Sequence, residues 1–419
     1  MKRWAILLSF LVMLAATVAH AQDSDEDKTG KGTLTGRVFY TDSKTPARLA
    51  QVTLLKLVSA GDKTPTSKNP FVAMLSKGGC GLKCFSSTGL DGRFVMDEVP
   101  AGSYVVMAVQ QGAVPPLARG DLNELNKASL SEVSADVIKS FAKDLTIVSV
   151  VAGKKSDVDV NLTHGAVLQG TVSYDDGSPA VAVKVHLLYK TKSGEFAEPN
   201  AMSLGAAATN STLMGYMTDD SGHYRIAGLA PGSYAVRVEL PLNMLKNLSK
   251  NLMGAIALGV ANPKAMGNAT AMGDGLSVYS GNVFFKKDLK AIAVGENEQT
   301  VAEDLTIPVD GMHSVTAHVV ESATGKGVGV AQVLLMDSEG KETLRSGFVD
   351  DDGTCTFDYV PNGLYLLRVA NAMAEKEKGQ GYLDASKIQH YKGSEAKVQV
   401  NEDVSGVQLS VSKIESESK

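Results

Sequence analysis

The chain has 419 residues, and its 46 acidic side chains outnumber its 41 basic ones, which gives a formal net charge of −5. Nucleic-acid binding needs a basic surface, so this balance argues against a nucleic-acid partner. At ~100–200 residues per domain, the length predicts two to four domains. After the first residues no stretch reaches ~18 uninterrupted apolar residues, so we expect no transmembrane segment in the mature chain.

The N-terminus has the pattern of a secretory signal peptide. A short positive region, Met1–Arg3, precedes the apolar stretch Ala5–Val18, and Ala19–Ala21 offers small residues for cleavage. We therefore expect residues 1–21 to be removed and the chain to be exported to the periplasm, the cell surface or the medium. Residues 22–31 are acidic and contain glycine, and we expect them to be a disordered linker.

One spacing of turn residues occurs three times, at intervals of about 130 residues. Each copy has a glycine after Asp or Ser, a second glycine ten positions later, and a tyrosine two positions after that. The residues are Gly92, Gly102 and Tyr104; Gly222, Gly232 and Tyr234; and Gly353, Gly363 and Tyr365. Glycine at the first position suits a tight turn, since it tolerates positive φ. We expect the tyrosine ring to be buried and its hydroxyl to bond nearby backbone. The copies are called the first, second and third repeats below.

Alternation of apolar residues around these turns predicts half-buried β-strands. The opening strands carry it at Leu34, Gly36, Val38 and Tyr40; at Leu168, Gly170, Val172 and Tyr174; and at Val315, Ala317, Val319 and Glu321. The sequence thus predicts an all-β fold of three tandem seven-stranded antiparallel β-sandwich domains with helical insertions. The predicted domains are 32–163, 164–310 and 311–419, the last with a short acidic tail. Their very short junctions predict a semi-rigid rod.

The insertions differ from one repeat to the next. Residues 121–143 have helical periodicity, 242–260 form a more apolar helical pattern followed by a Met- and Gly-rich segment to 275, and 372–389 form a short polar insert. We expect the helices to pack across sandwich edges. A role of the 242–260 helix at a partner or membrane surface is the alternative.

The repeated pattern also resembles a known family. The second repeat has it most fully, as Gly170-Thr171-Val172, then Asp219 to Ile226, then Gly228 to Val236, and this resembles the carboxypeptidase regulatory-like domain. The third repeat departs from it at Ala317 and Asn362. The resemblance implies a prealbumin-like (transthyretin-like) sandwich, also grouped with carbohydrate-binding-like folds. It further implies an accessory module beside peptidases, receptors and other envelope proteins.

Residues for catalysis are missing from the pattern. The sequence has no Gly-x-Ser-x-Gly elbow and no phosphate-binding loop. His318 and Glu321, with His390 as a third ligand, superficially resemble a zinc motif. In a strand, however, residues three apart point to opposite faces, so the two cannot converge on one ion. We predict that the chain is not an enzyme and has no cofactor.

Metal binding has two further candidates, both weak. Asp219, Asp220, Asp350 and Asp352 cluster beside turn glycines and could contribute to a calcium site, but such a site needs about 6–8 oxygen ligands. Ordinary turn chemistry is the favoured interpretation of these carboxylates. Methionines that gather in the second repeat could hold Cu(I), although their spacing is irregular.

Three cysteines remain in the chain after export, which places them in an oxidising compartment. Cys80 and Cys84 lie close together, and we predict a local disulfide between them, with two free thiols as the alternative. Cys355 aligns with the inward aromatic positions Phe94 and Tyr224, so we expect it to be a buried and inert thiol.

These observations favour a non-catalytic, exported cell-envelope protein that acts as a scaffold, adhesion or docking module and binds an envelope protein. The alternative is a protein that binds cell-wall or extracellular polysaccharide. Sugar sites usually use flat aromatic rings. The single tryptophan, Trp4, leaves with the signal peptide, which weakens this alternative. Four tyrosines were predicted to be free to face outward, namely Tyr189, Tyr279, Tyr382 and Tyr391. A hydrolase hidden in the insertions is a third hypothesis.

Overall fold

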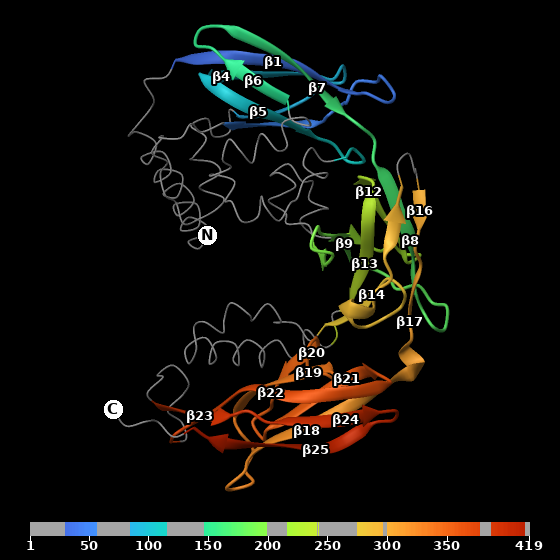
Figure 1. The fold of residues 1–419 in the computed structure, drawn as a ribbon, viewed down its shortest axis with the longest axis vertical. Helices are drawn as coiled ribbons and strands as arrows, with labels where there is room; N and C mark the ends of the chain where they lie inside the picture. The colour runs from blue at the N-terminus through green and yellow to red at the C-terminus, as the bar shows by residue number, and fades with distance from the viewer. Residues whose placement is uncertain are drawn as a thin grey trace, which may run out of the picture. The chain divides into compact units, whose positions relative to one another are not determined.

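The computed structural model describes residues 30–56, 84–114, 146–198, 216–240, 242, 275–295, 300–377 and 387–414. Within these ranges the secondary structure is β-strand apart from short 3-10 turns, so the all-β prediction is confirmed (Figure 1). The chain divides into two compact units, one ending at His164 and the other beginning at Gly165. The first repeat lies in unit 1, and the second and third repeats lie in unit 2.

Unit 1 contains two sheets. One has the strand order β4-β1-β7, and the other has the order β3-β2-β5-β6. The strands are β1 (Lys31–Tyr40), β2 (Gln51–Lys56), β3 (Phe85–Ser87), β4 (Arg93–Pro100), β5 (Gly102–Val109), β6 (Thr146–Val150) and β7 (Lys155–Leu162). The alternation predicted for the opening strand is observed, because Leu34, Val38 and Tyr40 are buried in the core of this unit.

The second repeat builds the same arrangement. One sheet joins β12, β8, β16 and β17, and the other joins β10, β11, β9, β13, β14 and β15. The strands are β8 (Ala166–Tyr174), β9 (Lys184–Lys190), β10 (Phe196–Ala197), β11 (Tyr216–Met217), β12 (His223–Leu229), β13 (Gly232–Leu240), β14 (Leu276–Tyr279), β15 (Ile292–Val294), β16 (Thr300–Ala302) and β17 (Leu305–Ile307). A 3-10 turn, η4 (Lys286–Asp288), precedes β15, and another, η5 (Val309–Gly311), follows β17.

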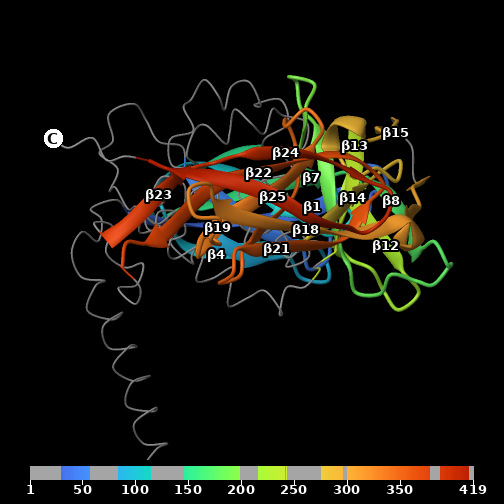
Figure 2. The ribbon, with the colours of Figure 1, turned by 90° about the horizontal axis from the view of Figure 1, so that it is seen from below.

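The third repeat forms a continuous eight-stranded sheet. The order of its strands is β20-β19-β22-β23-β25-β18-β21, and β24 also pairs with β22. Strands β22, β25, β18 and β21 of this repeat are labelled in Figure 2. The strands are β18 (Met312–Glu321), β19 (Val330–Asp337), β20 (Thr343–Phe348), β21 (Thr354–Pro361), β22 (Gly363–Glu375), β23 (Ile388–Lys392), β24 (Glu395–Val400) and β25 (Val404–Lys413). The pairing of β23 with both β22 and β25 makes the sheet continuous.

One parallel pair recurs in every repeat, and the sequence did not predict it. The opening strand pairs antiparallel with the strand after the turn glycine, and on its other edge it pairs parallel with the closing strand: β1 with β7, β8 with β17, and β18 with β25. Alternation reveals which side of a strand is buried, but it carries no information on strand direction.

The predicted insertions have different outcomes. Residues 121–143 and nearly all of 242–275 lie outside the described residues. The third insert is partly a β-hairpin extension rather than a polar loop, because Ala372 to Glu375 of β22 pair with Ile388 to Tyr391 of β23. Ala372, Met373 and Ile388 are buried there. The charged run that made this segment look polar lies at and beyond the end of β22.

Buried side chains form two clusters, one for each unit. The first repeat has its own core. The second and third repeats share one cluster, in which Leu276 and Ile307 belong with Phe357 and Leu409. Contacts between these two repeats include an ion pair of 2.5 Å between Lys287 Nζ and Asp337 Oδ2. The two repeats of unit 2 are therefore joined by packing and by charge. No helix among the described residues is long and apolar enough to span a membrane.

Candidate functional site

The turn glycines occupy the same geometry in all three repeats. Gly92, Gly222 and Gly353 have φ of 77°, 76° and 86°. Each carbonyl oxygen accepts a hydrogen bond of 2.8 Å from a valine N–H in the middle of the opening strand. A Cβ atom on these glycines would lie 2.4–2.7 Å from the carbonyl oxygen of that same valine. The turn can therefore close on the strand only if the residue is glycine.

The repeated tyrosines are buried, and each is tied to the backbone. The hydroxyls of Tyr104, Tyr234 and Tyr365 donate to the carbonyl oxygens four residues earlier, at 2.7, 2.7 and 2.8 Å. Burial raises the pKa of Tyr365 to about 12, so its hydroxyl remains a donor. A Cβ atom on the glycine two residues before each tyrosine would lie within 3.2–3.6 Å of the tyrosine ring. Gly102, Gly232 and Gly363 thus allow the ring to fold back over the chain.

The acidic turns use their carboxylates within the turn. Asp219 Oδ1 accepts the N–H groups of Ser221 and His223 at 2.9 and 2.8 Å, and Asp352 Oδ1 accepts that of Thr354 at 2.9 Å. Backbone hydrogen bonds lower the pKa of Asp219 below its ordinary value. Asp220 is exposed, and the backbone of Asp350 closes the turn with Thr354 and Gly353. No group of His, Cys, Asp or Glu in the described ranges could hold a metal ion.

His318 and Glu321 are engaged with different partners. Both lie on β18, where His318 Nδ1 is 3.1 Å from Thr354 Oγ1. Glu321 Oε1 forms an ion pair of 2.9 Å with Lys413 Nζ of β25. His390 lies on β23, paired with Met373. His318 and Glu321 are thus each held by a residue of a different neighbouring strand.

The cysteines lie in two environments. Cys355 is a buried thiol on β21 and belongs to no disulfide. Cys84 is buried in the core of unit 1, whereas Cys80 lies outside the described residues. The disulfide between Cys80 and Cys84 therefore stays a prediction.

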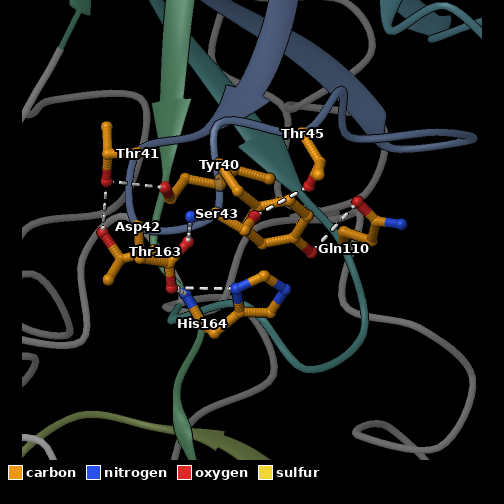
Figure 3. A network of polar contacts seen from close by, with 9 residues as sticks. Tyr40, Thr41, Asp42, Ser43, Thr45, Gln110, Thr163 and His164 are labelled. Atoms are coloured by element: carbon orange, nitrogen blue, oxygen red, sulfur yellow. Dashed lines mark hydrogen bonds and ion pairs between the residues drawn. The ribbon is translucent and has the colours of Figure 1, made fainter.

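A network of polar contacts lies where the chain leaves unit 1 (Figure 3). Asp42 Oδ2 accepts the backbone N–H of His164 at 3.1 Å and lies 2.8 Å from its Nδ1. The imidazole ring stacks on Tyr40, with centroids 3.8 Å apart and planes inclined by 6°. Tyr40 also donates its hydroxyl to Gln110 Oε1 at 3.1 Å. These contacts fix the last residue of the unit.

Electrostatics in this network favour the ionised carboxylate. Partial burial raises the pKa of Asp42, but hydrogen bonds from the His164 side chain and from the N–H groups of His164 and Ser43 outweigh it, so the pKa is lowered. The Tyr40 ring stacks on the imidazole, while its hydroxyl donates to Gln110. The imidazole is thus engaged with Asp42, and Tyr40 is not positioned as its proton-transfer partner.

A related contact occurs at the end of the second repeat. Asp175 Oδ2 accepts the backbone N–H of Asp310 at 2.9 Å, and the N–H of Asp175 donates to Ile307. In both repeats the carboxylate lies just after the opening strand and holds a residue just beyond the closing strand. The sequence analysis missed this role. The signal was an aspartate one or two residues after the strand-end tyrosine, at Asp42 and Asp175.

Two buried threonines were also missed. Thr88 Oγ1 donates to the carbonyl of Ala47 at 2.6 Å and accepts the N–H of Ala50 at 2.8 Å. Thr218 makes the same pair of bonds to Ala180 and Val183, at 2.6 and 3.0 Å. Each threonine lies three residues before the Asp-Gly or Ser-Gly turn, so an alignment of the repeats could have found them.

A second polar cluster lies on the β9–β13 sheet of the second repeat. His186 Nε2 is 3.0 Å from Glu239 Oε2, and His186 Nδ1 is 3.6 Å from Glu198 Oε2. Arg237 NH2 forms an ion pair of 2.6 Å with Glu198 Oε1. Hydrogen bonds with Glu198 and Glu239 raise the pKa of His186, and His186 in turn lowers the pKa of both glutamates. Each of the four side chains thus has an oppositely charged or hydrogen-bonding partner in the cluster, although the buried Nε of Arg237 has none among the described residues.

The aromatic side chains proposed for sugar binding are mostly covered. Tyr391 is buried, with 8% of its surface exposed, so the prediction that it faces outward is wrong; it lies in the hairpin that the sequence did not predict. Tyr189 and Tyr279 are half-buried, and Tyr382 lies outside the described residues. Tyr359 is the tyrosine with the largest exposed fraction, 47%, in the described part of the chain.

Comparison with known proteins gives similarity to solved β-sandwich structures. No protein-family model matches the sequence, and no curated protein matches it. Over 92% of the chain the fold is similar to a Streptococcal ancillary pilin at 12% identity, with a TM-score of 0.26 and 99% of that chain covered. The Bacillus anthracis TIE protein is similar over 92% of this chain at 12% identity and a TM-score of 0.19, and the match spans about half (51%) of its length.

A shorter similarity involves a putative carbohydrate-binding protein from Pseudomonas aeruginosa. It covers 33% of this chain and 97% of the other, at 13% identity and a TM-score of 0.18. At such identities and TM-scores, these similarities carry no argument about what the chain binds or does.

Proposed function

We propose that the protein is a non-catalytic scaffold, adhesion or docking module of the cell envelope. It is exported with removal of residues 1–21, and it consists of three tandem sandwich domains of the carboxypeptidase regulatory-like kind, over 32–163, 164–310 and 311–419. Its partner is another envelope protein. The destination is the periplasm, the cell surface or the extracellular medium.

The observation that carries this proposal is the use of the repeated residues. The turn glycines close against the opening strand, and the tyrosine hydroxyls cap backbone carbonyls. Each position that recurs three times thus serves the fold. A repeated catalytic site would instead repeat titratable side chains that converge on one point.

The junction contacts support a scaffold with defined chain paths. Asp42 holds His164 at the end of unit 1, and Asp175 holds Asp310 at the end of the second repeat. Hydrogen bonds to a charged acceptor are stronger than neutral ones, so each contact restricts the first residues of a linker.

A pull-down from envelope extracts tests the partner. The mature chain is used as bait beside a variant that lacks residues 242–275, with a variant whose residues 242–275 are replaced by a Gly/Ser linker of equal length as the matched control. A scaffold should capture discrete envelope proteins. Loss of every partner in both variants would assign the binding to the insertion and not to the sandwiches. Capture of no protein at all contradicts the docking role.

The alternative function is binding of cell-wall or extracellular polysaccharide. It is favoured only by the sandwich fold and by the half-buried Tyr189 and Tyr279, which lie on β9 and β14, the two strands that flank β13 in one sheet. Titration of the mature chain with envelope glycans separates the two functions. Saturable binding below the millimolar range supports the alternative, and absence of saturation supports the scaffold. A hydrolase is tested by turnover that a single acidic or histidine substitution abolishes.

A further inference from the structure

The charge cluster around His186 is confined to the second repeat. His186 on β9 pairs with Arg237 on β13. The same cross-strand position holds Thr53 and Met107 in the first repeat, and Leu334 and Arg368 in the third. Arg368 has its own carboxylate, with Nε 2.5 Å from Glu395 Oε1, but no histidine. The third repeat thus has the arginine–glutamate pair without a group that titrates near neutral pH.

The imidazole of His186 bridges two strands and the residue that follows β10. Its two ring nitrogens face different carboxylates, Glu239 on β13 and Glu198 immediately after β10. The His186 side chain is 17% exposed and Arg237 is 21% exposed, so the pairs are only partly screened by water. Arg237 NH2 also faces both carboxylates, at 2.6 Å from Glu198 Oε1 and 3.8 Å from Glu239 Oε2.

The net charge of the cluster depends on whether the imidazole of His186 is protonated. Arg237 contributes one positive charge, and Glu198 and Glu239 contribute two negative charges. With a neutral imidazole the cluster keeps one excess negative charge, which a proton on His186 cancels. The other ionisable groups around the site are Lys184 on β9, which acts on Glu239, and Tyr279 on β14, which senses Arg237, Glu342 and Glu198. None of these titrates between pH 5 and 8 at its ordinary pKa.

We propose that protonation of His186 ties Glu198 and the end of β10 to the β9–β13 sheet, so that this edge of the second repeat is held more firmly in mildly acidic medium than at alkaline pH. The short edge strand β10 has only two residue pairs with β9, Phe196 with Lys190 and Ala197 with Tyr189. Two backbone pairs hold a strand weakly, so a charged side-chain bridge at its end changes how often it opens.

The direction of the pH effect follows from the difference between the pKa values of His186 in the folded and the opened state. The pKa of His186 is raised in the folded state, so the stabilisation is fully present below the ordinary histidine value of about 6.5. It is lost as the pH rises through the folded pKa. The equilibrium constant for local opening then changes about tenfold for each unit that separates the folded and opened pKa values.

An NMR titration of the full mature chain tests the proposal. The His186 ring resonance, assigned by its loss in His186→Leu, should titrate with a midpoint above the ordinary histidine value of about 6.5. Glu198→Gln and Glu239→Gln should each lower this midpoint. A midpoint at or below about 6.5, or one that neither glutamine variant moves, contradicts the proposal.

Amide hydrogen exchange measures how often the end of β10 opens from the β9–β13 sheet. In the native chain the opening constants of Ala197 and Glu198, corrected for intrinsic rates, should rise as the pH passes upward through the His186 midpoint. His186→Leu copies the third repeat and should remove this pH dependence. Amides of β19 and β22 beside Leu334 and Arg368 serve as the internal control. Equal opening of Ala197 and Glu198 on both sides of the midpoint overturns the proposal.

Discussion

The second and third repeats fill the same cross-strand position with different pairs of side chains. Gly170 lies opposite Tyr224 in the second repeat, whereas Ala317 lies opposite Cys355 in the third. The Tyr224 ring lies over bare Gly170, and its hydroxyl donates to the carbonyl of Glu303 at 2.5 Å. A larger residue on the opening strand is thus matched by a smaller one on its neighbour. The Ala317–Cys355 pair is nevertheless much smaller than the Gly170–Tyr224 pair. This difference teaches that the repeats preserve the strand pairing and not the volume of the pair or the identity of either residue.

The largest effect is expected from exchanging the strand residue alone. A Cβ atom on Gly170 would lie 1.8 Å from the Glu303 carbonyl oxygen and 3.0 Å from the Tyr224 ring. Gly170→Ala should therefore destabilise unit 2 by about 3 kcal/mol, at the upper end of overpacking costs. Ala317→Gly in the third repeat should cost about 1 kcal/mol, because glycine weakens a strand.

Urea unfolding of the mature chain measures both variants. Gly177→Ala is the control for a methyl group added where no atom lies within 4 Å, and any loss it shows comes from its φ of 81°. Equal losses for Gly170→Ala and Gly177→Ala would contradict a steric clash at Gly170.

The next effect concerns the ion pair that joins the two repeats of unit 2. Asp337 is buried, accepts the N–H groups of Lys341 and Glu342, and pairs with Lys287 Nζ at 2.5 Å. Although burial raises the pKa of Asp337, these hydrogen bonds and the Lys287 charge bring it down to about 2. The carboxylate therefore stabilises the fold above its ordinary pKa of about 3.9, and this is lost as the pH falls toward 2.

Asp337→Asn should lower the stability of unit 2 by about 2 kcal/mol at pH 7 and flatten its loss between pH 4 and 2. Thermal unfolding at a series of pH values measures this. Glu339→Gln is the matched control, because Glu339 lies in the same hairpin and forms its ion pair with exposed Lys341. A steep acid loss that persists in Asp337→Asn contradicts the assignment.

A smaller loss of stability is expected when the buried threonine of the second repeat is replaced by the residue that the third repeat has there. Thr218 makes two hydrogen bonds across the loop from Ala180 to Val183, and the third repeat has Val349 at the equivalent position. Thr218→Val should cost about 1–2 kcal/mol, because the N–H of Val183 loses its buried acceptor. Thr218→Ser keeps the hydroxyl and should recover part of the loss. If Val and Ser variants unfold at the same urea concentration, the hydroxyl has no such role.

The smallest effect is expected at the bulge before the second turn. Tyr359 in the third repeat has φ of 57°, whereas the second repeat has Gly228 with φ of 87°. Gly228→Ala should destabilise by about 1 kcal/mol. Tyr359→Gly should be neutral or stabilising by about 0.5 kcal/mol, because it relieves a left-handed tyrosine that is half exposed. Circular dichroism melts of the two variants compare them, and a large loss for Tyr359→Gly would show that the ring packs more than its exposure indicates.

Prediction from the sequence succeeded where a local backbone conformation or a strand face requires one type of residue. The positive φ of Gly92 needs a residue without a side chain, and Leu34 and Val38 alternate on one face of a strand. It failed at 372–375, where charged neighbours suggested a polar insert and the chain instead extends β22. It also failed to find Asp42 and Thr88, because a polar side chain that bonds distant backbone has no local pattern.

The sequence by itself determined the all-β fold, the three positions of the repeated turn and the burial of the repeated tyrosines. These follow from φ preferences and from the two-residue period of a strand, which act over a few neighbouring residues. Tertiary structure alone decided the parallel closing strands, the shared core of the second and third repeats, and the meeting of His186 with Glu198 and Glu239. Those contacts join residues far apart in the chain or on different strands, and their energies depend on burial and distance, which no local pattern records.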